Sequence, residues 1–344
     1  MQKAVSSLKG VVGFVLGVSF SYLVMSGPCS AQASKVQKEK VEIKWVLAHE
    51  PSSVFRHAAK HFEELLAKET NGNLTIKVMT LKEYGGPSAT IASLIRDLRQ
   101  GKIQMTQTYT FQLGQLENAF YVLDLPFLFR SHEHAAKVLE GPTGNRLMES
   151  LVAKNLRGLS FTYSGGYRIL PAKKQISRYE DFKGMKVRTA LSPVTKEMYQ
   201  QLEAVSVPGS IERGTRLTAQ GKLDGLETTY VRYTADLETK APILNETFHT
   251  LFLTGILVNN EFFESLPAEY REILKKAAIQ AGRDERATTI SDSQQIREDL
   301  QKHGVKIVEM SQKEKERFRV AMEPVYAKFE PIFGNSLIKE IQEQ

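Results

Sequence analysis

From residue 41 onward, apolar and polar positions alternate between strand-like and helix-like patterns. Residues 43–48 (IKWVLA) predict a strand. Ser52 or Ser53 is a suitable cap for a helix whose apolar residues lie near one face, and the segment 70–73 (TNGN) ends it. Residues 74–78 (LTIKV) predict the next strand. This βαβ opening indicates a parallel pair of strands and an α/β fold.

A second α/β cycle begins near Gly165. Its predicted elements are a strand at 185–189, a helix from Ser192-Pro193 to about 204, a strand at 205–208, a helix ending at Gly221 and a strand at 223–227. A further helix after Pro87 and a short strand near 103–105 belong to the first cycle. The chain therefore predicts α/β layers throughout.

Two long elements follow these cycles. Residues 249–259 (HTLFLTGILVN) predict a long apolar strand. Between Pro267 and Gly304 there is no proline, and Gly282 is the only glycine. A single helix over this stretch reaches on the order of 50 Å, more than one small domain needs. We expect it to lie across two domains and connect them.

The first 33 residues have the pattern of a signal peptide. Lys3 and Lys9 precede an uncharged, mostly apolar run at 10–25, and Ala31-Gln32-Ala33 matches the small-x-small cleavage pattern. The run is short for a membrane span, so an uncleaved anchor is the weaker alternative. Cys29 follows a proline, which does not suit a lipid-attachment site. We expect cleavage after Ala33 and a periplasmic protein.

Cleavage leaves 311 residues and removes Cys29, the only cysteine of the 344-residue chain. No thiol, disulfide or cysteine metal site then remains, so packing must supply the stability. The net charge falls from +7 to +5, because only Lys3 and Lys9 are lost. The remaining charges are mixed in sign, as in residues 313–317 (KEKER), which argues against nucleic-acid binding. No later segment is apolar enough to span a membrane.

The common enzyme motifs do not occur in the sequence. The dinucleotide, P-loop, zinc-protease and nucleophile-elbow patterns are all missing. His57 and His61 have a spacing that suits a metal on one helix face, but no third ligand is near them. We interpret both as ordinary histidines. The expectation is a protein that is not an enzyme and that uses no metal or cofactor.

Several short motifs occur in a recognisable order. They are ETNG at 69–72, DLPFLF at 124–129, GYR at 166–168, DFKGMKVR at 181–188, LDGLE at 223–227 and NNEFFESLP at 259–267. With these motifs the chain resembles the solute-binding subunits of tripartite ATP-independent periplasmic (TRAP) transporters, of the dicarboxylate-binding (DctP) type. The similarity runs from about residue 41 to about residue 330.

The resemblance implies a two-lobed α/β periplasmic binding protein, a clamshell with a hinge and a long helix crossing both lobes. We predict a first lobe from residues 41–165 and 254–293. The second lobe is predicted from residues 166–253 and 294–344.

The resemblance also places a carboxylate-binding arginine at Arg188, the end of the strand in DFKGMKVR. A guanidinium keeps its charge and matches two carboxylate oxygens with its fork of donors. Arg168, after Gly165-Gly166, corresponds to a second arginine near the same anion. Its alternative is an interdomain salt bridge.

The segment after Asp224 departs from the family pattern, because Thr228-Thr229 replaces the common Asn-Pro. Thr228 is shorter than asparagine and offers only a hydroxyl, which weakens the expectation of the usual dicarboxylate ligands. We expect Glu227 either to contact the ligand or to pair with a neighbouring arginine. Tyr230 and Tyr233 are expected either to line the cleft or to pack in the protein interior.

Three further candidates complete the predicted site. Glu212 at a helix start either caps the helix, which we favour, or faces the cleft. Glu50 corresponds to a first-lobe ligand contact of the family. Thr108 and Tyr109 follow a first-lobe strand and are plausible polar contacts, whereas we expect Phe127 to pack in the core.

The leading hypothesis is a receptor that binds a small organic acid reversibly and delivers it to the small and large membrane subunits of a TRAP transporter. A carboxylate, a sugar acid and a sulfonate all remain open as ligands. A sensor that presents its bound state to a signalling receptor needs the same clamshell and stays an alternative. A periplasmic hydrolase or lyase is less favoured, because no acid–base or nucleophile constellation is visible.

Overall fold

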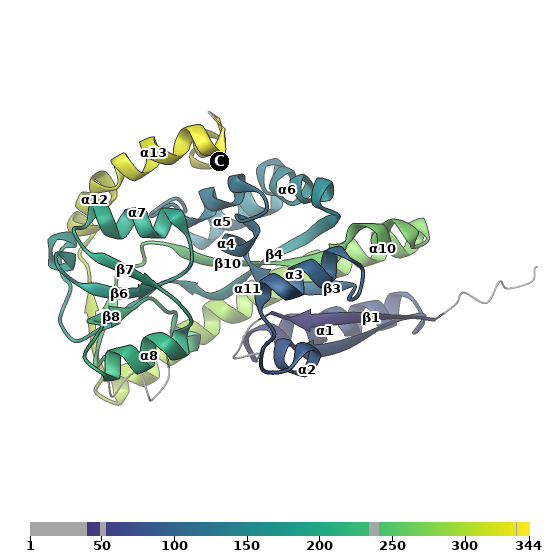
Figure 1. Cartoon of the computed structure of the whole chain (residues 1–344), viewed down its shortest axis with the longest axis horizontal. Helices are drawn as coiled ribbons and strands as arrows, with labels where there is room; N and C mark the ends of the chain where they lie inside the picture. The colour runs from purple at the N-terminus through teal and green to yellow at the C-terminus, as the bar shows by residue number, and fades with distance from the viewer. Residues whose placement is uncertain (1–39, 49–52, 234–240, 335) are drawn as a thin grey trace, which may run out of the picture. The chain divides into compact units, whose positions relative to one another are not determined.

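The computed structural model describes residues 40–48, 53–233, 241–334 and 336–344. These residues form two lobes, each built on one β-sheet (Figure 1). The predicted signal peptide lies outside the described residues. The two-lobed α/β fold predicted from the motifs is confirmed.

The first lobe contains a five-stranded sheet. Its strand order is β2 (Leu74–Thr80), β1 (Val41–Leu47), β3 (Met105–Tyr109), β10 (Leu251–Asn259) and β4 (Leu156–Tyr167). β1 is parallel to β2 and β3, as the βαβ pattern predicts, and β10 runs antiparallel to β3 and β4. β3 begins at Met105 and not at 103, so the sequence placed this strand too early.

Helix α1 (Ser53–Glu69) packs on this sheet through its apolar residues. Phe62 meets Trp45 of β1 edge to face, with ring centroids 5.1 Å apart. Asn71 and Gly72 adopt positive φ angles of 50° and 73° and turn the chain out of the helix. The other helices of this lobe are α2 (Leu81–Gly85), α3 (Ile91–Arg99), α4 (Thr110–Leu113), η1 (Asn118–Asp124), α5 (His132–Glu140), α6 (Pro142–Glu149), η2 (Ser150–Lys154) and α10 (Asn260–Ser265).

The second lobe contains a six-stranded sheet. Its order is β11 (Lys306–Glu309), β9 (Ile243–Glu246), β5 (Leu170–Ala172), β8 (Gly225–Leu226), β6 (Lys186–Thr189) and β7 (Val205–Pro208). Its helices are η3 (Tyr179–Phe182), α7 (Pro193–Gln201), α8 (Ile211–Ala219) and η4 (Tyr230–Arg232). The Ser192 hydroxyl caps α7 and Pro193 begins it, as the sequence predicts.

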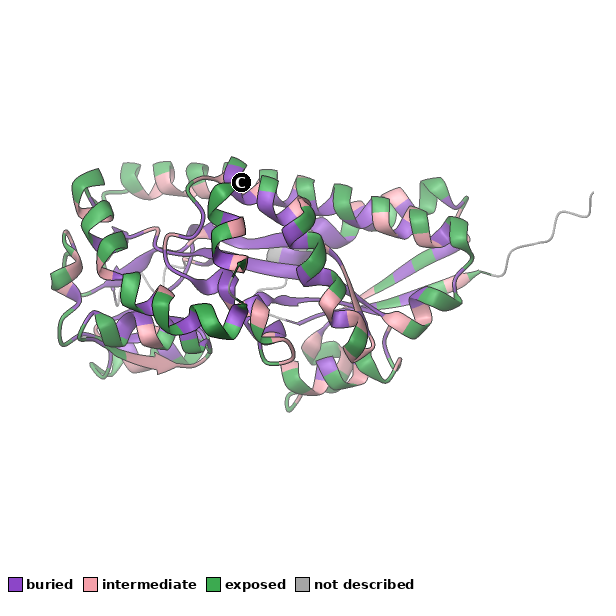
Figure 2. Cartoon of the chain, turned by 90° about the horizontal axis from the view of Figure 1, so that it is seen from above, coloured by how far each residue is buried: buried purple, intermediate pink, exposed green. Residues whose placement is uncertain are grey.

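Helix α11 (Ala268–Lys302) is a single helix of 35 residues. It packs on α1 and β4 of the first lobe and continues to η4 of the second. Figure 2 shows a buried stripe along the half that covers the first sheet and a more exposed surface beyond it. The prediction of one long helix across both lobes is confirmed.

Two of the chain segments that cross between the lobes pair with each other at Arg168. Its backbone N–H donates to Thr250, and its carbonyl accepts from Phe248. Just before this point Gly165 has a φ of 93°, and a Cβ there would lie 2.0 Å from the Thr229 hydroxyl oxygen. Glycine is therefore required at this position of the crossing.

The C-terminal helices make a further connection. They are α12 (Gln312–Ala321), α13 (Glu323–Phe333) and α14 (Leu337–Glu343). α13 packs on both α7 and η1, and the Tyr326 hydroxyl donates to the carbonyl of Pro126 at 2.7 Å. α14 packs on α6, although the predicted limits put residues 294–344 with the second lobe. The limits of the two lobes remain a prediction.

Candidate functional site

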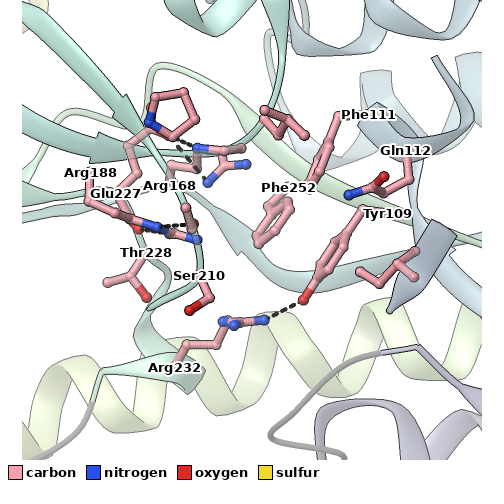
Figure 3. A pocket seen from close by; sticks show the side chains of 15 residues that line it. Tyr109, Phe111, Gln112, Arg168, Arg188, Ser210, Glu227, Thr228, Arg232 and Phe252 are labelled. Carbon is pink, nitrogen blue, oxygen red and sulfur yellow. Dashed lines mark hydrogen bonds and ion pairs between the residues drawn. The ribbon is translucent and has the colours of Figure 1, made fainter. Parts of the chain in front are cut away.

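A cavity of about 400 Å³ lies between the two sheets (Figure 3). The first lobe and its strands contribute Ile91, Tyr109, Phe111, Gln112 and Phe252. The second lobe and the crossing contribute Arg168, Arg188, Ala190, Leu191, Pro208, Gly209, Ser210, Glu227, Thr228 and Arg232. Among these described lining residues there are three guanidinium groups and one carboxylate, so the cavity carries an excess of positive charge.

Arg188 lies in β6 with its guanidinium held from two sides. Its Nε donates to the carbonyl of Gly209 at 2.7 Å, and Nη1 donates to the carbonyl of Glu227 at 2.9 Å. A guanidinium has five N–H donors, so three are left for a ligand. Burial and the neighbouring Arg168 lower the pKa of Arg188 from 12.5 to about 10, which keeps the group charged at neutral pH.

A glycine makes room for the stem of Arg188. Gly214 lies inside helix α8, where glycine is normally unfavourable. A Cβ at this position would lie 2.6 Å from the Cγ of Arg188. The close approach of α8 to Arg188 therefore depends on the missing side chain.

Arg168 is 2% exposed and lies between a carboxylate and an aromatic ring. Its Nη1 is 3.6 Å from Glu227 Oε2, and the guanidinium carbon lies 3.9 Å from the centroid of the Phe252 ring. This Nη1 has no hydrogen-bond partner among the described residues. A buried charged donor without such a bond is costly and indicates a place for an acceptor.

Glu227 balances part of this charge. Its Oε1 lies 3.0 Å from Nε2 of His249, and its Oε2 accepts the backbone N–H of Ala190. Burial opposes ionisation, but Arg168, His249 and Arg188 outweigh it and lower the pKa of Glu227 from 4.5 to about 2. Glu227 therefore both lines the cavity and pairs with an arginine, so the two alternatives from the sequence are not exclusive.

A second carboxyl group, that of Asp124, is buried near Arg168. Burial raises its pKa from 3.8 to about 6, although a hydrogen bond from Ser192 and the charge of Arg168 favour the ionised form. The two carboxyl groups near Arg168 thus titrate in different pH ranges.

Arg232 is a lining residue that the sequence analysis missed. Its Nη1 donates to the Tyr109 hydroxyl at 2.7 Å and lies 3.3 Å from Oγ of Ser164 (Figure 3). This contact joins η4 to β3 of the other lobe. Arg232 lies in the sequence between Tyr230 and Tyr233, which were both considered as cleft residues, and this position could have indicated that it lines the cavity.

Three aromatic rings form a layer next to Arg168. Tyr109 lies parallel to Phe252 and to Phe111, with centroid distances of 4.8 and 5.1 Å and interplanar angles of 7° and 11°. Phe252 belongs to the buried strand β10, where nothing in the sequence distinguishes a cavity residue from a core residue. This layer could not be recognised before the fold was known.

Of the other predicted site residues, some line the cavity and some do not. Thr228 lines the cavity, and its Oγ1 is buried without a hydrogen-bond partner in the described part of the chain. Tyr230 does not line the cavity, since its hydroxyl donates to Glu246 at 2.5 Å. Glu212 is exposed in the first turn of α8 and does not line the cavity either. Glu50 lies outside the described residues.

Comparison with known proteins identifies the family. A family model described as bacterial extracellular solute-binding protein, family 7 (DctP), matches residues 47–331. The chain belongs to this family. It is a solute-binding protein and not an enzyme, and its resemblance to TRAP solute-binding subunits is confirmed. In the described part of the chain, none of the helices has the length and apolarity for a membrane crossing.

Individual relatives share most of the chain. The C4-dicarboxylate-binding protein DctB of Bacillus subtilis is 27% identical over 291 residues, which are 83% of this chain and 81% of that protein. A crystal structure of a TRAP periplasmic solute binding protein from Ochrobactrum anthropi has a TM-score of 0.81 and 26% identity, covering 89% of this chain and 94% of that one. A Bradyrhizobium protein in complex with galacturonate has a TM-score of 0.78 and 26% identity, covering 88% and 100%.

Proposed function

We propose that this protein captures a small organic acid in the cavity between its lobes and delivers it to the membrane subunits of a TRAP-type transporter. One observation carries the proposal: Arg168 and Thr228 line the cavity, and Nη1 of Arg168 and Oγ1 of Thr228 are buried without hydrogen-bond partners among the described residues. Arg188, with three N–H donors that bond to none of the described residues, lines the same cavity. A carboxylate accepts from several donors at once and compensates the excess positive charge.

The predicted residues that line the cavity have different roles in this proposal, whereas Tyr230 and Glu212 have none. Arg188 is the principal anchor, since two backbone carbonyls hold its guanidinium in place. Arg168 and Thr228 add donors to the same acid group, and Glu227 orients both arginines. Glu50 stays a proposed contact from the first lobe.

The relatives support the proposed partners. The similar structures are TRAP periplasmic solute binding proteins, and several of them hold sugar acids such as galacturonate and D-glucuronate. We also propose that residues 1–33 are cleaved during export to the periplasm. The intact mass of the exported protein tests this step, since a mass that includes residues 1–33 would rule it out.

Ligand binding is tested by thermal shift with pairs of acids and their amides. A ligand that binds the folded form raises the melting temperature by mass action. We expect acids to stabilise the protein and the matched amides to have little effect. An equal effect of acid and amide would show that the arginines do not bind a carboxylate.

Delivery is tested by uptake into membrane vesicles that contain the small and large membrane subunits of a TRAP transporter. Uptake of the acid should require the binding protein. Acid binding without any stimulation of uptake would favour a sensor role instead.

A further inference from the structure

The cavity has its charge on one side and an apolar surface on the other. All the charged lining residues of the described chain come from the second lobe and the crossing segment. The first lobe adds Ile91, Phe111 and Phe252, the ring of Tyr109, and the amide of Gln112. This division constrains the part of a ligand that lies beyond its acid group.

The charged end and the aromatic layer are in direct contact. The guanidinium of Arg168 stacks on one side of the layer, 3.9 Å from the Phe252 centroid. The Phe111 and Phe252 centroids lie 6.4 Å apart with an interplanar angle of 17°, so the rings form a continuous surface. A carboxylate held at Arg168 therefore places its next carbon atoms beside these rings.

Few polar groups reach this part of the cavity. The Tyr109 hydroxyl accepts from Arg232, which leaves the Gln112 amide as the other polar side chain that the described first lobe offers. From the second lobe Ala190, Leu191 and Pro208 are also apolar, and the Ser210 hydroxyl already accepts the backbone N–H of Arg213 at 3.3 Å. Hydroxyl groups of a ligand would lose water here without gaining enough hydrogen bonds, which is unfavourable for each group.

Leu191 adds a second, independent observation. It lines the cavity and is 53% exposed, more than any other large apolar side chain in the described chain. An exposed leucine at the edge of a cavity becomes favourable when an apolar group covers it. The ligand's carbon skeleton is well placed to do so.

We propose that the ligand is an organic acid with an apolar, aryl or branched-alkyl, carbon skeleton, and not a polyhydroxylated or dicarboxylic acid. This inference rests on the proposed function and narrows it. The acid group binds at the arginines, and the apolar skeleton packs between the aromatic layer and Leu191.

Ligands with equal carbon number test the proposal. 4-Methylpentanoate, D-gluconate and adipate each have six carbons and differ in the number of polar groups that they carry. Phenylacetate, with eight carbons, is added as an aryl acid. Calorimetric titration of the purified protein, after unfolding and refolding to remove carried-over ligand, measures each affinity. We expect 4-methylpentanoate and phenylacetate to bind at least about tenfold more tightly than the other two.

The outcomes separate the two proposals. Tighter binding of D-gluconate or adipate would overturn the apolar-skeleton inference and leave the acid receptor intact. Equal binding of 4-methylpentanoate and 4-methylpentanamide would overturn the acid receptor itself.

A substitution in the aromatic layer gives a second test. Phe111→Ser should weaken binding of phenylacetate about tenfold and change D-gluconate binding less, because it replaces apolar surface by a hydroxyl. Phe111→Leu keeps the surface apolar and is measured if the serine variant is unstable. Phe262→Leu, on α10 outside the cavity, is the matched control. Equal losses for phenylacetate and D-gluconate in the Phe111 variants would contradict the proposed packing.

Discussion

The two walls of the cavity are built in different ways. The second-lobe wall carries guanidinium groups fixed by backbone carbonyls and a carboxylate, as at Arg188 and Glu227. The first-lobe wall is a layer of parallel rings. In the function we propose, the charged wall holds the acid group at one place and the aromatic wall packs on the apolar skeleton. On this proposal the charged wall decides whether an acid binds, and the aromatic wall decides which acid.

The largest expected effect is on stability, from Arg168→Met. This change leaves the buried carboxylate of Glu227 without its guanidinium partner, so the free energy of unfolding should fall by about 3–5 kcal/mol. Urea denaturation without ligand measures it. Arg168→Lys keeps the charge and serves as control. If both variants are as stable as the wild type, the ion pair between Arg168 and Glu227 does not contribute to the free energy of unfolding.

Arg188→Lys should affect binding more than stability. The charge is kept and the planar fork is lost, which costs on the order of 2–5 kcal/mol for a sheltered charge pair, or roughly 30-fold or more in affinity. Arg168→Lys should cost less in affinity. Calorimetric titration with the tightest acid of the six-carbon panel measures both. Unchanged affinity of Arg188→Lys in a folded protein would remove the proposed anchor.

Gly214→Ala tests how the charged wall is positioned. The new Cβ would displace the stem of Arg188, while alanine is itself favourable in a helix. We expect affinity to fall about tenfold, near 1.4 kcal/mol, with little loss of stability. Thr215→Ala on the same helix is the control. A Gly214→Ala protein that binds normally would show that α8 adjusts freely around Arg188.

The pH dependence separates the two carboxyl groups behind the arginines. The pKa of Asp124 is raised to about 6 in the folded protein, so its stabilising contribution is complete below its ordinary value of 3.8 and is lost as the pH rises through 6. Glu227, with a pKa lowered to about 2, contributes stability above 4.5 that is lost as the pH falls toward 2.

The unfolding free energy of the wild type and of Asp124→Asn is measured from pH 4 to 7. The difference between the two proteins isolates the contribution of the Asp124 carboxyl group. We expect the variant to lose less stability over this range than the wild type. Parallel pH profiles for the two proteins would mean that Asp124 keeps an ordinary pKa.

The smallest effect belongs to the apolar edge of the cavity. Leu191→Ser should weaken phenylacetate binding by only a few-fold, because one partly exposed side chain is lost. Stability should change by less than about 0.5 kcal/mol, as for other exposed positions. Val205→Ser is the control, since Val205 is 51% exposed and does not line the cavity. Equal effects of both changes on affinity would remove Leu191 from the binding surface.

The sequence by itself determined the α/β class, the long helix and the position of two arginines. These follow from local signals: apolar periodicity, the capping Ser192 before Pro193, and the glycine-free stretches of the helix after Pro267. The family motifs then indicated Arg188 and Arg168 by number. Local patterns are sufficient here because strands and helices depend mainly on neighbours in the chain.

Only the tertiary structure decided what surrounds those arginines. The aromatic layer joins Tyr109 and Phe111 to Phe252, which is more than 140 positions away along the chain. Arg232 lines the cavity because η4 packs against β4 and α11, and the Tyr230 side chain is held elsewhere because Glu246 accepts its hydroxyl. Such contacts arise from packing between distant segments, and a periodic pattern cannot distinguish a ring in a cavity wall from a ring in the core.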